Sequence, residues 1–138
     1  MNIVVVPKKD IDTVWPHVKD YLDKAARLSL GRFTIEEIKH NLDTKNQQLW
    51  IAFDNDKIVA SAITEIMEYP KIKTLFGHFI GGIELETWKQ PIVDNMAEFC
   101  RQNGCDRIEF MGRRGWGKPL KSIGWKETYR VYEYYVEN

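Results

Sequence analysis

Cysteine and histidine are scarce in this sequence. The two cysteines, Cys100 and Cys105, flank the end of an expected helix, and nothing in the sequence indicates secretion. We therefore expect two reduced, packed thiols rather than a disulfide. The three histidines, His17, His40 and His78, have no metal-ligand spacing with one another or with the cysteines. The absence of such spacing argues against a zinc site.

The chain also lacks net charge and long apolar runs. Lys plus Arg and Asp plus Glu number 20 each, so no overall charge favours nucleic acid or an anionic membrane. No apolar run approaches the roughly 20 residues that span a bilayer. Met1 and Asn2 lead directly into the strand-like residues 3–6, so no signal peptide is expected. The 138 residues predict one soluble domain, residues 1–138, in the cytoplasm.

Two kinds of periodicity alternate along the chain. Runs rich in β-branched and aromatic residues predict strands, and apolar residues at helical spacing predict helices. The expected strands are 3–6, 49–53, 57–67, 74–83, 107–111 and 128–136. The expected helices begin near Asp12, Thr34, Thr87 and Trp116, and either Asp10 or Asp12 can cap the first of them. The predicted order is therefore β α α β β β α β α β, with no linker or repeat.

Several short signals support this order. Thr34 and Glu37 have the spacing of a capping box, and residues 54–56 (Asp-Asn-Asp) indicate a hairpin. Asn103-Gly104 is typical of a left-handed helix end, and Pro16 fits best in the first turn of its helix. Residues 57–67 are apolar on both faces, as expected for a central strand with helices on each side.

Residues 73–116 form a strand–helix–strand unit around which the other elements are expected to be arranged. Such a unit crosses over in a right-handed way and pairs its two strands in parallel. The loop after the first strand and the backbone after the second then meet at one end of the sheet. Open α/β sheets bind ligands at such an end.

The element order and three segments carry a resemblance to a known family. The segments are LWIAFDNDKIVASAITEI (49–66), IGGIELETW (80–88) and FCRQNGCDRIEFMGRRGWGKPLKSIGW (99–125). Over nearly the whole chain they resemble the GNAT superfamily of acyl-CoA-dependent N-acyltransferases, and more narrowly small GNAT-like proteins of tailed phages and prophages. The resemblance implies an α/β (α+β) single-domain GNAT-type fold, with a mixed, mostly antiparallel central sheet flanked by about four helices.

The resemblance also implies a function. An active member would transfer an acetyl group from acetyl-CoA to a primary amine, by direct attack within a ternary complex. The alternative is a non-catalytic phage protein that keeps the scaffold, either as a virion component or as a modulator of a host protein. The partners would then be an acyl-CoA and an amine acceptor, or a host or virion protein. The expected location is the host cytoplasm or the virion.

Residues 80–89 correspond to the pyrophosphate loop of the family, whose pattern is Arg/Gln-x-x-Gly-x-Gly/Ala. The resemblance assigns cofactor binding to Ile80, Gly81, Gly82, Ile83 and Lys89. Glycines allow backbone N–H groups to approach phosphate, and a helix N-terminus adds a positive dipole. However, the loop lacks the expected Arg or Gln, and Glu84 and Glu86 stand where the diphosphate would lie. The loop is degenerate, so acetyl-CoA binding is either weakened or lost.

The catalytic groups also depart from the family pattern. Many members carry a Tyr five residues before the aromatic residue of a Gly-Phe element, and Leu120 stands at that position here. An amine acceptor needs a base, because an ammonium is not a nucleophile. The candidates inside the expected strands are His78 and Glu65. The alternative for His78 is a strand histidine satisfied by a neighbour, and for Glu65 an ordinary residue near a strand end.

Positive charge gathers between Arg113 and Arg130. Six basic residues against one acid give a local charge of +5. Arg113 and Arg114 follow a strand at the expected ligand end, so they are candidates for holding the cofactor's phosphates. The alternatives are a solvated basic face with Trp116 and Trp125 packing a short helix onto the sheet, or a surface for nucleic acid or an acidic protein.

Overall fold

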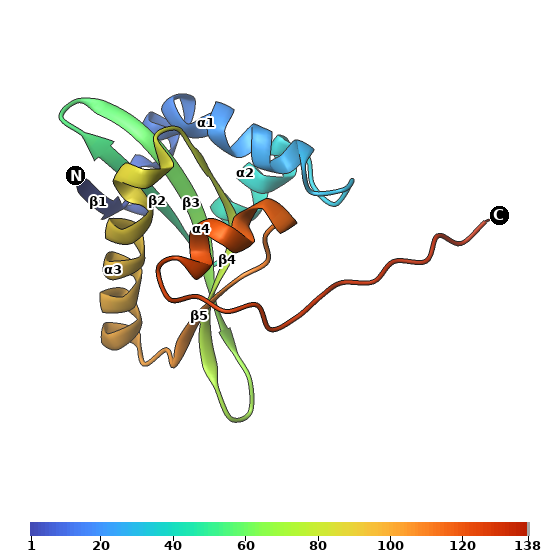
Figure 1. Cartoon of the computed structure of the whole chain (residues 1–138). Coiled ribbons are helices and arrows are strands. Elements are labelled where there is room, and N and C mark those ends of the chain that lie inside the picture. Colours follow the sequence, from blue (N-terminus) through green and yellow to red (C-terminus); the bar gives the residue numbers. More distant parts are fainter. Residues whose placement is uncertain (138) are drawn as a thin grey trace.

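A five-stranded sheet with strand order β1-β2-β3-β4-β5 forms the centre of the structure, a computed structural model that describes residues 1–137 (Figure 1). The strands are β1 (Asn2–Val5), β2 (Gln47–Asp54), β3 (Lys57–Glu68), β4 (Lys73–Gly82) and β5 (Arg107–Phe110). The helices are α1 (Ile11–Arg27), α2 (Ile35–Thr44), α3 (Leu85–Asn103) and α4 (Gly117–Lys121), with short 3-10 turns η1 (Lys8–Asp10) and η2 (Arg114–Trp116). Neighbouring strands are antiparallel, except β4 and β5, which are parallel. The predicted mixed, mostly antiparallel sheet is confirmed.

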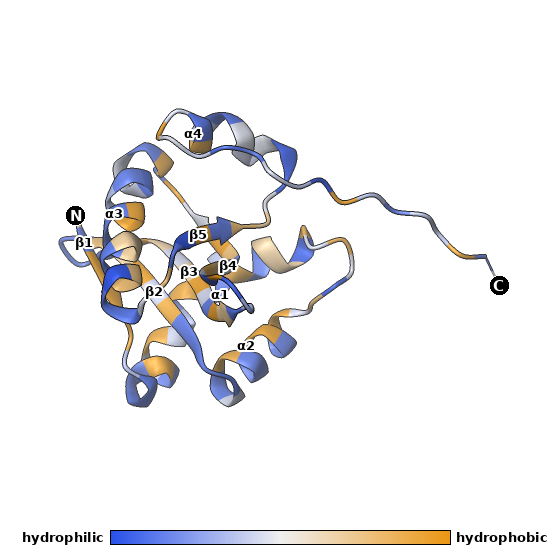
Figure 2. Ribbon diagram, turned by 90° about the horizontal axis from the view of Figure 1, so that it is seen from below, coloured by the Kyte–Doolittle hydropathy of each residue, from blue (hydrophilic) through white to orange (hydrophobic). Residues whose placement is uncertain are grey.

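The sheet lies between two helical layers. Figure 2 shows α3 on one side of it and α1 and α2 on the other. One apolar cluster joins α1 and α2 to the sheet, with Leu22 and Ile63 fully buried in it. A second cluster joins α3 to the opposite face, with Trp88 and Leu75 among its members. Because β3 contributes to both clusters, its prediction as a central strand is confirmed.

Local signals in the sequence predict several element ends correctly. The Thr34–Glu37 capping box forms at the start of α2. Asn55 has a positive φ of 56° in the turn between β2 and β3. Gly104 ends α3 in the left-handed conformation. All three features depend on contacts between residues no more than four positions apart, so the local sequence is enough to predict them.

One helix start and the position of one proline differ from the prediction. The helix α3 begins at Leu85 and not at Thr87, because Glu84 takes the left-handed conformation just before it. The Thr87 hydroxyl donates to the Glu84 carbonyl oxygen at 2.7 Å and so lies inside the first turn. The helix α1 begins at Ile11, directly after Asp10, which is one of the two residues expected to precede it. Pro16 therefore lies in its second turn and not in its first.

The final strand predicted at 128–136 is not formed. The chain beyond Trp125 is extended, pairs with no strand among the described residues and runs away from the body of the molecule (Figure 1). Its apolar side chains are exposed, with Tyr132 at 88% and Tyr134 at 91%. Strand propensity alone cannot form a strand, because the hydrogen bonds need a neighbour. The prediction was therefore wrong about pairing.

Both cysteines are free thiols at the end of α3. Burial, together with the neighbouring Cys105, raises the pKa of the Cys100 thiol to about 11. Since the thiolate is the reactive form, iodoacetamide at pH 8 should label Cys105 in the native protein and leave Cys100 largely unmodified. Peptide mass spectrometry measures this, with urea-unfolded protein as the control in which both react. Equal labelling of both thiols in the native state would contradict the structure.

Candidate functional site

The strands β4 and β5 separate halfway along the sheet. They pair only where Thr74–Gly77 runs beside Arg107–Phe110. Beyond this point β4 continues to Gly82, whereas the chain leaves β5 for α4. A narrow pocket with a cavity volume of about 40 Å³, open at its mouth, lies at the divergence between the sheet, α3 and α4. Its walls are mainly apolar and include Gly77, Ile92, Met96, Phe110, Leu120 and Trp125.

A β-bulge lies in β4 at the same level. Thr64 of β3 is opposite Gly77, and the next residue back, Ile63, is opposite Phe79, so His78 has no partner on β3. Side chains normally alternate between faces along a strand, and a bulge interrupts this alternation. Phe79 packs into the apolar cluster under α1 and α2. His78 lies on the same face of the sheet, as its contact with Glu65 shows.

His78 belongs to a row of three polar side chains on that face. Its Nε2 lies 2.9 Å from Glu65 Oε1, and the Gln47 amide donates to the same carboxylate at 3.1 Å. The His78 and Glu65 side chains are 24% and 25% exposed. Burial alone would raise the pKa of Glu65, but the hydrogen bonds from Gln47 and His78, with the charges of His78 and Lys45, lower it overall. A histidine held by a carboxylate can accept a proton near neutral pH.

The structure thus brings together the two candidates that the sequence suggested, His78 and Glu65. Sequence reasoning missed Gln47, which lies directly opposite Glu65 on β2. No local pattern marks Gln47, because its role depends on the register between strands separated by a hairpin. Only the pairing of β2 with β3 could have revealed it.

The two loop glycines are explained by packing within the protein. A Cβ added at Gly81 would lie 2.5 Å from the carbonyl oxygen of Tyr21 on α1. At Gly82 a Cβ would collide with the carbonyl oxygen of Val59 and with Ala60 on β3. Glycine is required at both positions because the backbone of the chain itself approaches so closely.

The backbone groups of Ile83, which follows the two glycines, also form hydrogen bonds within the protein. The Ile83 N–H donates to Val59 O at 2.8 Å, and the Ile83 carbonyl accepts from the Trp88 indole at 2.7 Å. Ile80 packs into the cluster beneath α3 and lines the pocket. In the first turn of α3, the Thr87 N–H donates to the Glu84 carbonyl oxygen at 2.9 Å. The N–H groups of Leu85 and Glu86 remain as donors, since a helix start has no intrahelical acceptors for them.

Two carboxylates flank these donors. Glu84 lies 3.9 Å from Lys57, and Glu86 pairs with Lys89 at 3.0 Å. The Lys89 side chain is only 13% exposed, and its ammonium also donates to Ser122 Oγ at 3.0 Å. Lys89 therefore links the start of α3 to the end of α4 and lines the pocket. Its charge is already partnered at the place where a phosphate would bind.

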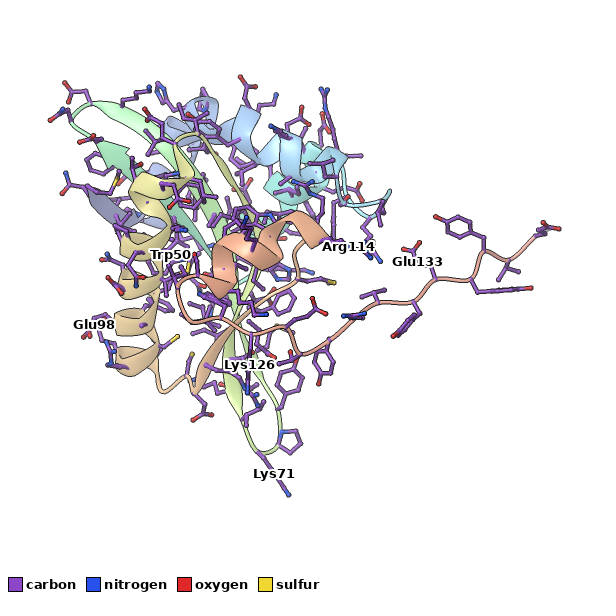
Figure 3. All side chains as sticks on the ribbon, in the orientation of Figure 1. Trp50, Lys71, Glu98, Arg114, Lys126 and Glu133 are labelled. Atoms are coloured by element: carbon purple, nitrogen blue, oxygen red, sulfur yellow. The ribbon has the colours of Figure 1, made fainter. Side chains whose placement is uncertain are left out.

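Arg113 and Arg114 lie elsewhere. Both are exposed, and neither makes an ion pair or a side-chain hydrogen bond within residues 1–137. They precede α4, whereas Ser122, which contacts Lys89, follows it. Figure 3 shows Arg114 at the end of α4 that faces away from α3. The structure does not bring these arginines to the glycine loop.

The tryptophans of the basic segment pack α4 onto the sheet. Trp116 meets Phe110 edge to face, with ring centroids 5.5 Å apart, and Trp125 lines the pocket. Leu120 also lines it, so the position where the family carries a Tyr does face the pocket. Among residues 1–137 no tyrosine lines this pocket. The structure therefore shows an apolar pocket on one face of the sheet and the His78–Glu65 pair on the other, but no tyrosine beside the pocket.

No protein-family model and no curated protein matches this sequence. Solved structures do match its fold over nearly the full length. A ribosomal-protein-alanine N-acetyltransferase from Brucella melitensis is similar with a TM-score of 0.72 at 12% identity, covering 99% of this chain and 100% of that chain. The aminoglycoside 6'-N-acetyltransferase of Acinetobacter haemolyticus has a TM-score of 0.64 at 16% identity, covering 100% and 99%.

A third structure, described as a predicted acetyltransferase from Clostridium acetobutylicum, was solved with acetyl-CoA. It is similar with a TM-score of 0.66 at 14% identity, covering 97% of this chain and 95% of that chain. At such low identities the likeness concerns the fold. The chain therefore has the fold of GNAT acetyltransferases, as the resemblance implied.

Among the described residues, no helix is both long and apolar enough to cross a membrane. Within residues 1–137, no three His, Cys, Asp or Glu side chains are placed to share a metal ion.

Proposed function

We propose that this protein is an N-acyltransferase that moves an acetyl group from acetyl-CoA to a primary amine. The observation that carries the proposal is the divergence of β4 and β5. An apolar pocket opens there on the α3 side, and the His78–Glu65 pair lies on the α1 and α2 side of the same strands. An acyl donor and an amine approaching from opposite faces would meet at the bulge.

The pocket residues fit the two ends of acetyl-CoA unequally. The apolar walls from α3 and α4 suit the acyl and pantetheine part, which is largely uncharged. For the phosphates, the start of α3 offers N–H groups and a positive dipole, and Lys89 lies close by. Glu84 and Glu86 oppose an anion there, each by about 1 kcal/mol or more where water is partly excluded. We assign the phosphates to this helix start and Lys89, with Ile80, Gly81, Gly82 and Ile83 forming the wall. Arg113 and Arg114 lie outside this contact.

Acetyl-CoA supplies the thioester, and the residues of this chain handle the protons. His78 takes the proton from the acceptor ammonium, and Glu65, oriented by Gln47, stabilises the imidazolium that results. The amine nitrogen would then form its bond to the acyl carbon as the carbon–sulfur bond breaks, and the nitrogen would release its second proton to solvent. Because Leu120 has no proton to give, the departing thiolate is protonated by solvent.

Thermal unfolding with acetyl-CoA tests this function. A ligand present at about one hundred times its dissociation constant stabilises the folded protein by roughly 2.7 kcal/mol. Acetyl-CoA should therefore shift the melting temperature upward. Val93→Trp, which fills the pocket from α3, should abolish the shift. Glu98→Trp places the same side chain on the exposed face of that helix (Figure 3) and should leave it intact. Absence of any shift at millimolar acetyl-CoA would refute the proposal.

A second candidate is a non-catalytic binder of the tailed-phage type, acting in the virion or on a host protein. Leu120 in place of a phenol and the two glutamates at the start of α3 favour it. The exposed basic residues on and around α4 would then meet an acidic protein surface. This candidate requires that acetyl-CoA gives no shift and that the chain is recovered bound to virion or host protein.

A further inference from the structure

Two thiols meet in the turn between α3 and β5 (Figure 1). Gly104 ends the helix in the left-handed conformation, and the Cys105 N–H donates to the Cys100 carbonyl oxygen at 2.9 Å. A hydrogen bond from the residue after such a glycine back into the last turn of the helix is typical of a Schellman motif. The motif frequently brings the side chains of the two bonded residues into contact, and here both residues are cysteines.

The backbone limits how far apart the two cysteines can lie. A Cα atom lies about 2.4 Å from its own carbonyl oxygen and about 1.5 Å from its own nitrogen. With the 2.9 Å hydrogen bond between them, the two Cα atoms are at most about 6.8 Å apart. This limit lies within the range of about 4.4–6.8 Å that disulfides require. Cys100 belongs to the apolar cluster beneath α3 and Cys105 packs against the same cluster, so their side chains lie on the same side of the turn.

The turn that carries the thiols is held on both sides by the first residue of β4. The Lys73 ammonium donates to the Asn103 carbonyl oxygen at 2.7 Å, just before Gly104. The Lys73 N–H donates to the Asp106 carboxylate at 2.9 Å, and the Asp106 N–H donates back to the Lys73 carbonyl oxygen at 2.7 Å. These bonds fix the backbone before and after the turn, so the folded chain keeps the two cysteines close together.

We propose that Cys100 and Cys105 form a redox-active dithiol that hydrogen peroxide converts into a disulfide, which joins the end of α3 to the segment leading into β5. Both thiols are free in the structure, which is the reduced state of the pair. In compartments that keep thiols reduced, disulfides are usually transient and catalytic or redox-sensing. The proposal is independent of the acyltransferase function, because neither cysteine lines the pocket or contacts the His78–Glu65 pair.

The two thiols have different roles because their exposure differs. Cys105 is partly exposed, whereas Cys100 is 6% exposed. Burial, with the charge and the hydrogen bond of the neighbouring Cys105, raises the pKa of the Cys100 thiol to about 11, so Cys100 remains a protonated thiol at neutral pH. Cys105 is therefore the thiol that meets the peroxide, and Cys100 is the thiol that closes the disulfide.

The reaction proceeds in two steps. The Cys105 thiolate attacks one peroxide oxygen, so that a sulfur–oxygen bond forms, the oxygen–oxygen bond breaks and hydroxide leaves. This hydroxide takes up a proton equivalent to the one that Cys105 lost and becomes water. The Cys100 sulfur then attacks the sulfur of the resulting sulfenic acid, whose oxygen leaves with the Cys100 proton as a second water. The two thiols lose two electrons in total, and the peroxide gains them.

Intact-mass spectrometry of the reduced full chain treated with hydrogen peroxide tests the proposal. We expect the loss of two hydrogen atoms, no thiol left for iodoacetamide after unfolding, and full reversal by dithiothreitol. Cys100→Ala keeps the attacking thiol and removes its partner, so this variant should stop at a sulfenic acid that dimedone traps. Cys105→Ala is the matched control and should stay unoxidised under the same conditions. Circular dichroism checks that both variants are folded.

Phenylarsine oxide probes the distance between the thiols without any oxidation, because its arsenic bridges two thiols that lie close together. The folded natural protein should bind one equivalent, and neither variant should bind it stably. Three results would overturn the proposal: oxidation of Cys105 to the sulfinic acid while Cys100 stays a free thiol, a disulfide that joins two chains, or a disulfide that forms only after unfolding in urea.

Discussion

Replacing Gly81 with alanine is expected to destabilise the protein by at least about 3 kcal/mol. The new Cβ would lie 2.5 Å from the Tyr21 carbonyl oxygen, a backbone atom that cannot rotate away as a side chain can. Overpacking of a well-packed site costs about 1–3 kcal/mol, and collisions with backbone lie at or above the upper end of that range. Either α1 must shift off the sheet or β4 must bend. Urea unfolding monitored by circular dichroism measures the loss.

Gly117→Ala is the matched control. Gly117 begins α4 with helical dihedrals and has no neighbour within 4 Å of an added Cβ. The same chemical change there should be neutral or should stabilise by up to about 1 kcal/mol, because alanine reduces the freedom of the unfolded chain. Equal stability of the Gly81 and Gly117 variants would show that α1 does not approach β4 as described.

The second large effect is expected on catalysis. His78→Ala should lower the rate of acetyl transfer to an amine by about 10²–10⁴-fold, the range that general bases contribute. Stability should change much less, because the ring is half-buried on the sheet surface and lies outside both apolar clusters. Steady-state kinetics with a panel of primary amines provides the measurement. Full activity in the His78 variant would exclude it as the base.

Glu65→Gln separates the charge of the carboxylate from its size. In the folded protein the pKa of Glu65 lies below its ordinary value of 4.5, so the ionised carboxylate stabilises the fold at neutral pH. That contribution is lost as the pH falls through the lowered pKa. The variant should therefore be less stable than the natural protein at pH 7, and the difference should shrink on acidification. If the difference in stability between the two proteins does not shrink as the pH is lowered from 7, the hydrogen bonds from Gln47 and His78 to Glu65 would be contradicted.

The sequence predicts the scaffold well where neighbours along the chain decide the outcome. The capping box at Thr34, the turn at Asn55 and the end of α3 at Gly104 all depend on residues within a few positions. The central place of β3 follows from its two apolar faces. The parallel pairing of β4 with β5 follows from the helix between them.

The details of the site depend on contacts that sequence patterns do not record. The glycine pair matches a ligand loop in sequence, but the approach of Tyr21, some sixty residues earlier, explains one of its members. The polar row at Glu65 depends on strand register. The last strand was predicted from composition alone, and composition does not say which edge, or which molecule, supplies its neighbour.

The bulge at His78 has a consequence for how such a site can arise. Gly77 and Phe79 face consecutive residues of β3, Thr64 and Ile63, so the ladder would close regularly if His78 were deleted. Every other residue of β4 would keep its face and its partner. A single codon thus separates a plain sheet from one that carries an imidazole at the divergence of two strands. The imidazole at this position can therefore be gained or lost in one step while the pairing of β3 with β4 is kept.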